Sequence, residues 1–281
     1  MTQILPVPTL DHVVVNARDR IDEAAAAYRR LGFTLTPRGY HTLGSMNHLA
    51  MFGTDYLELI AAPAGSTQRP EILAAPDGLN GLVFGTEDSS AVYEALRAAG
   101  VAAAPPGQFS RPVTLGDGSS RDAVFRTVIL NQSAVAGRLY FCHHFTRDLV
   151  WRDEWRHHAN GTVGVARAVI AASDPAELGG LFARMFGDDS VGAIDGGFGL
   201  TVGLSRFEVV THARLLGMFG DAAPEALGRH CFMAALTLRT RSLDAAARAL
   251  AAGEVAGVRR NEAGIVVPAG SAFGTVLEFW G

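Results

Sequence analysis

Two residues able to bind a metal ion or transfer a proton interrupt two otherwise apolar segments of the chain. His12 lies within residues 10–15 (LDHVVV), and Glu58 lies within residues 56–60 (YLELI). In a strand, alternate residues share a face, so each polar side chain would lie among apolar neighbours. A buried carboxylate requires a cation, a hydrogen-bond donor or a proton. A metal ion or a polar ligand held between the two strands would meet this requirement for Glu58.

Two polar residues upstream of Glu58 extend this candidate site. A hairpin that turns through residues 53–55 (GTD) would place Ala50 opposite Glu58 and His48 on the face of Glu58. Asn47 would then point to the other side of an ideal strand. We predict substrate-binding roles for His48 and Asn47, and the alternative for His48 is a structural hydrogen bond to the backbone.

Aromatic and cationic residues elsewhere could also contact a ligand. Trp151 and Trp155 could wall the mouth of a binding site and hold a ligand by stacking, and the alternative is packing between domains. Arg111 and Arg126 could pair with a substrate carboxylate. We expect both arginines to form ion pairs with carboxylates of the protein instead.

The composition excludes several classes of function. The formal net charge is −4 at pH 7 and no basic run occurs, which argues against nucleic acid or an anionic membrane as partner. All 24 basic residues are arginines, so no lysine can form a Schiff base or act as a general base. We expect a small-molecule ligand and, because no glycine-rich phosphate loop precedes a helix, no nucleotide cofactor.

The cysteines and the hydropathy pattern favour a cytoplasmic protein. Cys142 and Cys231 lie far apart in apolar segments that resemble strands, which favours buried thiols over a disulfide. The first residues lack a basic region followed by an apolar core, and no apolar run approaches the length of a membrane span. We therefore expect neither export nor membrane insertion.

The first half of the chain contains one pattern twice. Residues 10–19 align without a gap with residues 79–88, and each segment leads into a helical stretch that ends at a glycine. Asp19 and Asp88 are placed to cap these helices. Extended sequence with turn signals follows each helix, so each copy reads as a strand, a helix and further strands.

The second half contains the same pattern twice more. The third copy begins at Val165 and the fourth at Phe232, with helix caps expected at Asp174 and Ser242. The sequence therefore predicts an α+β fold of four βαβββ units.

These features resemble the vicinal oxygen chelate superfamily, and more closely its glyoxalase-like branch. The likeness is carried by the opening strand at 10–14 (LDHVV), by residues 47–60 (NHLAMFGTDYLELI) and by residues 141–151 (FCHHFTRDLVW). In that superfamily two βαβββ units pair into a cup of eight strands. The resemblance implies two glyoxalase-like domains joined by a linker, with boundaries at 1–146, 147–161 and 162–281.

The resemblance also implies a metal site in the N-terminal domain. In the superfamily the ligands come from the first strands of two units and from a closing strand, and His12 and Glu58 occupy two of these positions. Gly81 stands where the second unit would supply its histidine. We predict His144, on the closing strand of the second unit, as the third ligand. Two histidines and a carboxylate would leave open positions on iron, manganese, zinc or nickel.

The C-terminal domain is predicted to lack such a site. Arg167 and Ala235 occupy the positions equivalent to His12, so Glu208 and Glu278 have no histidine partners. This domain would serve as a scaffold or as the surface of a homodimer.

The function implied by the resemblance is that of a metal-dependent lyase, isomerase or dioxygenase acting on a small substrate with vicinal oxygens. Glu58 would also be the catalytic group that moves a proton. The alternative is a protein of the same fold that binds or sequesters a small molecule without chemistry. The missing histidines favour this alternative, whereas the retained His12 and Glu58 oppose it.

Overall fold

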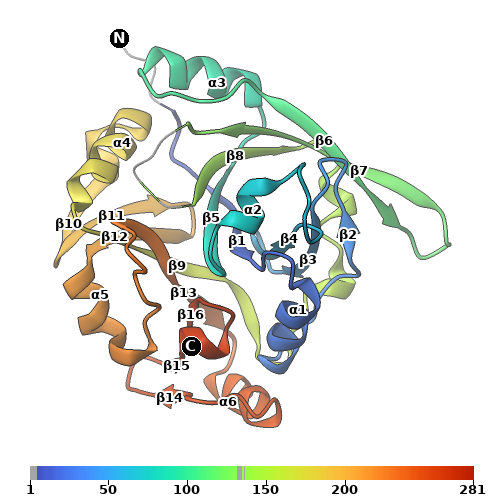
Figure 1. Cartoon of the computed structure of the whole chain (residues 1–281), viewed down its shortest axis with the longest axis vertical. Helices are drawn as coiled ribbons and strands as arrows, with labels where there is room; N and C mark the ends of the chain where they lie inside the picture. The colour runs from blue at the N-terminus through green and yellow to red at the C-terminus, as the bar shows by residue number, and fades with distance from the viewer. Residues whose placement is uncertain (1–4, 132–134, 136) are drawn as a thin grey trace.

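Each half of the chain forms one eight-stranded sheet in the computed structural model (Figure 1). The structure describes residues 5–131, 135 and 137–281. Residues 1–4, on which the expectation about export partly depends, lie outside this range. Among the described residues, no helix is both long enough and apolar enough to cross a membrane.

The first half follows the order strand, helix and three strands twice. Its first unit contains β1 (Leu10–Asn16), α1 (Ile21–Arg30), β2 (Gly39–Tyr40), β3 (Met46–Met51) and β4 (Tyr56–Ala61). A short helix, α2 (Pro70–Ala74), leads to the second unit, which contains β5 (Gly78–Gly85), α3 (Ser89–Ala98), β6 (Gly107–Thr114), β7 (Ser120–Ile129) and β8 (Arg138–His144). Two 3-10 helices follow, η1 (Arg147–Leu149) and η2 (Asp153–Trp155).

The second half follows the same order. Its first unit contains β9 (Thr162–Ala172), α4 (Pro175–Phe186), η3 (Asp188–Ser190), β10 (Val191–Ile194), β11 (Gly197–Val202) and β12 (Ser205–Thr211). The connection contains α5 (His212–Phe219) and η4 (Gly220–Ala222). The last unit contains β13 (Cys231–Thr240), α6 (Leu243–Ala252), β14 (Arg259–Arg260), β15 (Ile265–Val267), η5 (Ala269–Ser271) and β16 (Val276–Trp280).

Both sheets have the same strand order. The first strands of the two units pair antiparallel at the centre of each sheet, β1 with β5 and β9 with β13. The last strand of each unit lies parallel to its first strand, as β4 does beside β1 and β8 beside β5. The predicted α+β class is confirmed, and the polar residues of β1 and β4 lie on neighbouring strands.

Strand alternation divides the buried residues into three hydrophobic clusters. Val13 and Val15 of β1 belong to a cluster that extends through both halves of the chain. Val14 faces the other side of the first sheet, in a cluster with Tyr56 and Tyr140. We call this side of the first sheet the first cup. The corresponding side of the second sheet has a cluster of its own, and we call it the second cup.

Aromatic packing joins the two halves. Phe84 of β5 contacts Phe182 and Phe186 of α4, and it also contacts Phe207 of β12. Strands β5 and β13 lie side by side where the halves meet (Figure 1). Helices α1, α3, α4 and α6 and the sheet faces that they cover therefore share one core. Each cup has a separate cluster, which α2 joins in the first half and α5 in the second.

Most of the predicted helix caps are present. The Asp88 carboxylate accepts hydrogen bonds from two backbone N–H groups of α3, and Asp174 and Ser242 accept one each at α4 and α6. The prediction for Asp19 is wrong. The chain makes a tight turn after β1 in which the Arg20 N–H donates to the Ala17 carbonyl, so Arg20 takes the cap position before Ile21 and no side chain caps α1.

Removal of the Asp88 cap should destabilise the protein, whereas removal of the Asp19 carboxylate should not. Asp88→Ala leaves two N–H groups of α3 without their acceptor, and we expect a loss of about 1 kcal/mol in the free energy of unfolding. Asp19→Ala is the matched control, because Asp19 is exposed and caps no helix. Urea unfolding of both variants measures the difference. Equal losses would contradict the assignment of the cap.

A buried carboxylate at the junction of the halves should make stability depend on pH. The Asp55 carboxylate accepts a hydrogen bond from the Val165 N–H of β9 at 3.0 Å. Burial raises the pKa of Asp55 from 3.8 to about 6, against the opposing effects of that N–H and of Arg239. The folded-state pKa is the higher one, so the stability that Asp55 contributes is complete below its unfolded pKa and is lost as the pH rises through about 6.

Asp55→Asn, which can still accept the Val165 N–H, should therefore gain stability relative to the native protein as the pH rises. The difference should grow between the two pKa values and reach at most about 3 kcal/mol. Urea unfolding across the pH range measures it, with the exposed Asp19→Asn as control. Parallel pH profiles for the native protein and Asp55→Asn would exclude this role.

Candidate functional site

The first cup contains a small cavity with the two residues that the sequence placed first. His12 and Glu58 both line this cavity, which has a volume of about 70 Å³. His12 shares its strand face with Val14, and Val14 pairs with Glu58 in the parallel register of β1 and β4. Both side chains are buried, with 3% and 6% of their residue surface exposed. The fold therefore brings the predicted pair together inside one cavity.

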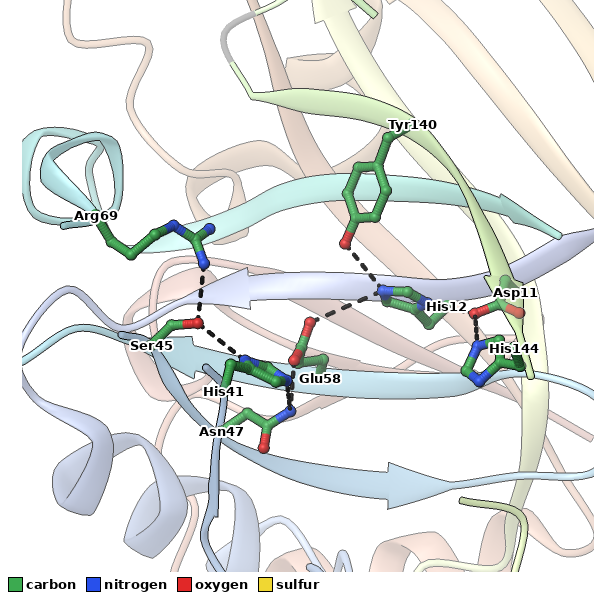
Figure 2. Close-up of polar contacts among 9 residues, drawn as sticks. All are labelled: Asp11, His12, His41, Ser45, Asn47, Glu58, Arg69, Tyr140 and His144. Atoms are coloured by element: carbon green, nitrogen blue, oxygen red, sulfur yellow. Dashed lines mark hydrogen bonds and ion pairs between the residues drawn. The ribbon is translucent and has the colours of Figure 1, made fainter. Parts of the chain in front are cut away.

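The His12 ring is held at both nitrogens. Its Nδ1 lies 2.6 Å from Asp11 Oδ1, and its Nε2 lies 3.0 Å from the Tyr140 hydroxyl (Figure 2). The same Nε2 is 3.8 Å from Glu58 Oε2. Because the Asp11 carboxylate accepts a hydrogen bond from the Nδ1–H, the neutral ring carries its lone pair on Nε2, which accepts from the Tyr140 hydroxyl at the cavity. Asp11 therefore orients His12 as a base or a metal ligand.

Glu58 is held in the charged form by its neighbours. Its Oε1 accepts a hydrogen bond of 2.6 Å from the Asn47 amide. Burial opposes the charge, but His41, His12 and Asn47 together outweigh burial and hold the pKa of Glu58 below its usual value. One carboxylate oxygen is thus bonded to Asn47, and the other faces His12.

His41 is a further member of the site. Its Nε2 lies 3.3 Å from the Asn47 amide nitrogen, and its Nδ1 lies 2.9 Å from the Ser45 hydroxyl, which also accepts from Arg69 (Figure 2). Burial lowers the pKa of His41 to about 4, and nearby Glu58 only partly opposes this. His41 is therefore uncharged at neutral pH, and its charge acts on Glu58 only in acidic solution.

The predicted hairpin register is wrong by one residue. Leu49, not Ala50, lies opposite Glu58, because the turn between β3 and β4 has four residues and is closed by a hydrogen bond from the Phe52 N–H to the Asp55 carbonyl. A slip of one residue exchanges the faces of a strand. Asn47 therefore faces Glu58, whereas His48 points away and lies 2.8 Å from the Thr36 carbonyl.

His144 lies close to the pair but bonds a different residue. Its Nε2 is 3.0 Å from Asp11 Oδ1, the same oxygen that His12 contacts. Among the described residues, the metal-competent group that forms around it consists of Asp11, Cys142 and His144, with ligand atoms within 4.8 Å of one another. Burial would raise the pKa of Asp11, but His144 and His12 hold it far below its usual value. Asp11 thus links the two predicted histidines.

The two tryptophans lie beside the cup rather than in the lining of its cavity. Trp151 packs edge-on against Tyr56 and His144, with ring centroids 5.2 Å and 5.0 Å away, and Arg147 covers its face. Trp155 packs against the hydrophobic cluster of the first cup. A larger cavity of about 660 Å³ lies between the halves and reaches Asp11 and His144, but the His12 and Glu58 side chains do not line it.

Sequence reasoning missed three members of the site. In an ideal strand Asp11 and His12 would point to opposite faces, so the sequence does not predict that they meet. A register shift in the pairing of β1 with β5, between Leu10 and His12, changes this alternation. His41 lies in a turn with no periodic signal. Tyr140 occupies in the second unit the register position of Glu58, since Val83 pairs with Tyr140 as Val14 pairs with Glu58. The internal repeat was the signal that could have identified it.

A sequence model described as a glyoxalase-like domain matches residues 10–186 of the chain, which is more than half of its length. The chain belongs to the glyoxalase-like family. This assignment confirms the resemblance to the vicinal oxygen chelate superfamily. The family match covers the whole first sheet and the first strand and helix of the second half. No curated protein matches the chain.

Solved structures share the glyoxalase-like fold at low sequence identity. A hypothetical protein from Staphylococcus aureus has a TM-score of 0.66 and 12% identity, and the match covers 97% of this chain and 99% of that one. A mutant of 4-hydroxymandelate synthase from Streptomyces coelicolor has a TM-score of 0.58 and 13% identity, covering 98% and 92%. A fusion of a xylose isomerase-like TIM barrel with 4-hydroxyphenylpyruvate dioxygenase has a TM-score of 0.57 and 11% identity, covering 99% and 50%.

The second cup of this glyoxalase-like chain has an arginine in the position of His12. Arg167 pairs with Arg206 in the β9 and β12 register as His12 pairs with Tyr56. Its guanidinium lies 3.2 Å from Glu208 and 2.8 Å from Glu278, and it also donates to the Thr237 hydroxyl. Arg167 thus supplies one fixed positive charge to both carboxylates that lacked histidine partners, and Arg206 supplies a second, 3.5 Å from Glu208.

Loss of Arg167 should strongly destabilise the second half. Arg167→Met leaves the buried Glu278 without its counter-charge and Glu208 with Arg206 alone, and we expect a loss of about 3–5 kcal/mol in the free energy of unfolding at neutral pH. The triple variant Arg167→Met, Glu208→Gln, Glu278→Gln should recover most of it. Chemical denaturation tests both, with Arg248→Met, at an exposed arginine in the same half, as control. A mild effect of Arg167→Met would show that the cluster is not a required ion pair.

Proposed function

We propose that the first cup is the active site of a metal-dependent enzyme acting on a small substrate with vicinal oxygens. The supporting observation is that His12 Nε2 and Glu58 Oε2 face each other at 3.8 Å inside one cavity. Asp11 and Asn47 bind the other heteroatoms of the two side chains, so the two inward atoms would be the ligands, with His12 Nε2 giving up its contact with the Tyr140 hydroxyl.

The donor set suits a divalent transition metal. An imidazole nitrogen and a carboxylate oxygen are accepted by iron, manganese, zinc and nickel. Asp11 supplies the outer carboxylate that metal-bound histidines commonly have. His144 remains a proposed third ligand and would have to leave Asp11 to take this role, whereas the Tyr140 oxygen already lies beside His12.

The reaction class follows from the chemistry that such a metal supplies. A metal held there would supply Lewis-acid polarisation of adjacent substrate oxygens, which serves a lyase or an isomerase, and a dioxygenase would also require a redox-active metal such as iron. Glu58 would move the proton, because Asn47 fixes one of its oxygens and leaves the other at the cavity. Asn47 and His41 would contact the substrate, and the apolar cup walls would limit access of water. No nucleotide cofactor is needed.

A binding protein without chemistry is the second candidate. The observation that favours it is that Gly81 and Tyr140 hold the positions that correspond to His12 and Glu58 in the second unit, so half of a symmetric ligand set is absent. A small molecule could then be held by Asn47, His41 and Tyr140 alone. Metal content distinguishes the two candidates.

Domain boundaries, a homodimer and a cytoplasmic location complete the proposal. We propose the division into residues 1–146, 147–161 and 162–281, with the candidate site confined to the first part. A homodimer and a cytoplasmic location are predictions of the sequence alone.

The native protein, purified without chelator, should contain about one equivalent of a transition metal, as expected for a single site. His12→Ala and Glu58→Ala should each lose it, because each removes one of the two inward donors. Plasma mass spectrometry measures the content.

The matched control is His157→Ala, which removes an exposed imidazole outside the cup. This variant should retain the metal. A native protein that stays free of metal after incubation with iron, manganese, zinc and nickel would exclude the enzyme proposal and leave the binding protein.

A further inference from the structure

The cavity of the first cup contains a buried guanidinium without a partner among the described residues. Arg111 of β6 lines the cavity together with His12 and Glu58, and only 7% of its surface is exposed. None of the ion pairs and side-chain hydrogen bonds among the described residues includes Arg111, although Arg69 and Arg126 nearby each have one. The expected pairing of Arg111 with a protein carboxylate is therefore wrong.

Burial of a cation without a partner raises the free energy of the folded state, so a bound anion would stabilise Arg111 at this position. A guanidinium withdrawn from water needs an opposite charge or several acceptors to offset the lost hydration. Glu58 is the carboxylate of this cavity, but its oxygens face Asn47 and His12. Burial lowers the pKa of Arg111, and the negative charge that Glu58 contributes only partly opposes this.

The backbone makes room for Arg111 at this place. Gly39 of β2 has no side chain, and a Cβ there would lie 3.1 Å from Arg111 Cδ and 2.5 Å from Asn47 Oδ1. Any larger residue would displace the arginine or the amide that holds Glu58. The glycine therefore allows Arg111 and Asn47 to lie together at the cavity.

The charges that line the cavity favour a negative ligand. Arg69 and Arg138 line it as well as Arg111, against the single carboxylate of Glu58. Arg69 is paired with Glu71 and bonded to Ser45, and Arg138 lies over the Tyr140 ring. Arg111 and Arg138 thus bring positive charge that no ion pair among the described residues offsets, and Arg111 is the buried one of the two, on the same cavity as the inward atoms of His12 and Glu58.

We propose that Arg111 binds the carboxylate of the substrate, so that the first cup takes a small organic acid. The planar fork of a guanidinium matches a carboxylate with two parallel hydrogen bonds. The cavity of about 70 Å³ restricts the acid to a few heavy atoms, well below the pockets of about 300–1,000 Å³ that take drug-sized ligands. This inference names the substrate class of the proposed enzyme, and it rests on the proposed function only for the reaction. The binding of a carboxylate by Arg111 does not depend on that reaction.

Thermal unfolding with small anions tests the inference. Acetate, glycolate and lactate, added at constant ionic strength, should raise the Tm of the native protein by a few degrees, whereas glycolamide and lactamide should not. Arg111→Met should abolish this response, and Arg111→Lys should retain a weaker one because a point charge remains. Inorganic phosphate is a separate arm, and a response to phosphate alone would assign the site to a different oxyanion and overturn the carboxylate proposal.

Arg126→Met is the matched control, because Arg126 comes from the adjacent strand β7 and is bonded to Gln108 outside the cavity. It should respond to the acids as the native protein does. Equal responses of the native protein and Arg111→Met, or no response of the native protein to any of the carboxylates, would overturn the proposal. In the absence of anions Arg111→Met should also have a Tm equal to or above the native value, since it removes an uncompensated buried charge.

The same series separates this inference from the metal proposal. Anion responses are measured on the protein as purified and after chelation, and metal content is measured for Arg111→Met. A response through Arg111 that survives chelation supports a carboxylate site that does not depend on a metal, and only a native protein that also stays free of metal after incubation with metals excludes the metal. Metal content that is retained in a protein with no carboxylate response would support the metal proposal and overturn the carboxylate site.

Discussion

The parallel pairing of β1 with β4 is the constraint on which the candidate site depends. It sets Val14 beside Glu58, so that His12, two residues earlier on the same strand face, points into the same cavity. A shift of this register by one residue would turn Glu58 into the core shared by both halves, where no cation is available. The register is strongly specified because the residues that alternate with His12 and Glu58, such as Val13, Leu57 and Leu59, are fully buried in that core.

The two cups show two solutions to one electrostatic problem. The first sheet has one buried carboxylate on a closing strand, Glu58, and the second has two largely buried ones, Glu208 and Glu278. Each of these carboxylates needs a positive charge or hydrogen-bond donors. In the second cup the guanidinium of Arg167 contacts Glu208 and Glu278 directly and Arg206 also pairs with Glu208, so two cations balance two carboxylates within the chain. In the first cup Glu58 has only neutral donors and an imidazole, whereas Arg111 lies apart from it without a partner. Charge is thus balanced in the second cup and left open to ligands in the first.

Much of this organisation was readable from the chain alone. The alignment of residues 10–19 with 79–88 predicted the repeated unit, since strands, caps and glycines recur at the same spacing, and three of the four expected caps are made. His12 and Glu58 were identifiable because burial of a polar side chain in an apolar strand is unfavourable unless it has a bonding partner or a ligand. Arg167 in the place of a histidine already argued against a metal in the second cup. These inferences depend on local pattern, and local pattern is a property of sequence.

Tertiary structure decided which side chains meet. The four-residue turn between β3 and β4 placed Asn47, rather than the expected His48, on the face of Glu58. The sequence pattern does not define the length of a turn to within one residue. A register shift after Leu10 brought Asp11 to His12 and His144, against the alternation of an ideal strand. The isolation of Arg111 could be seen only when its neighbours were known, because a charged residue in sequence shows neither its burial nor its partners. The sequence by itself determined the repeat and the two residues of interest; packing between distant strands decided the contacts that give the site its chemistry.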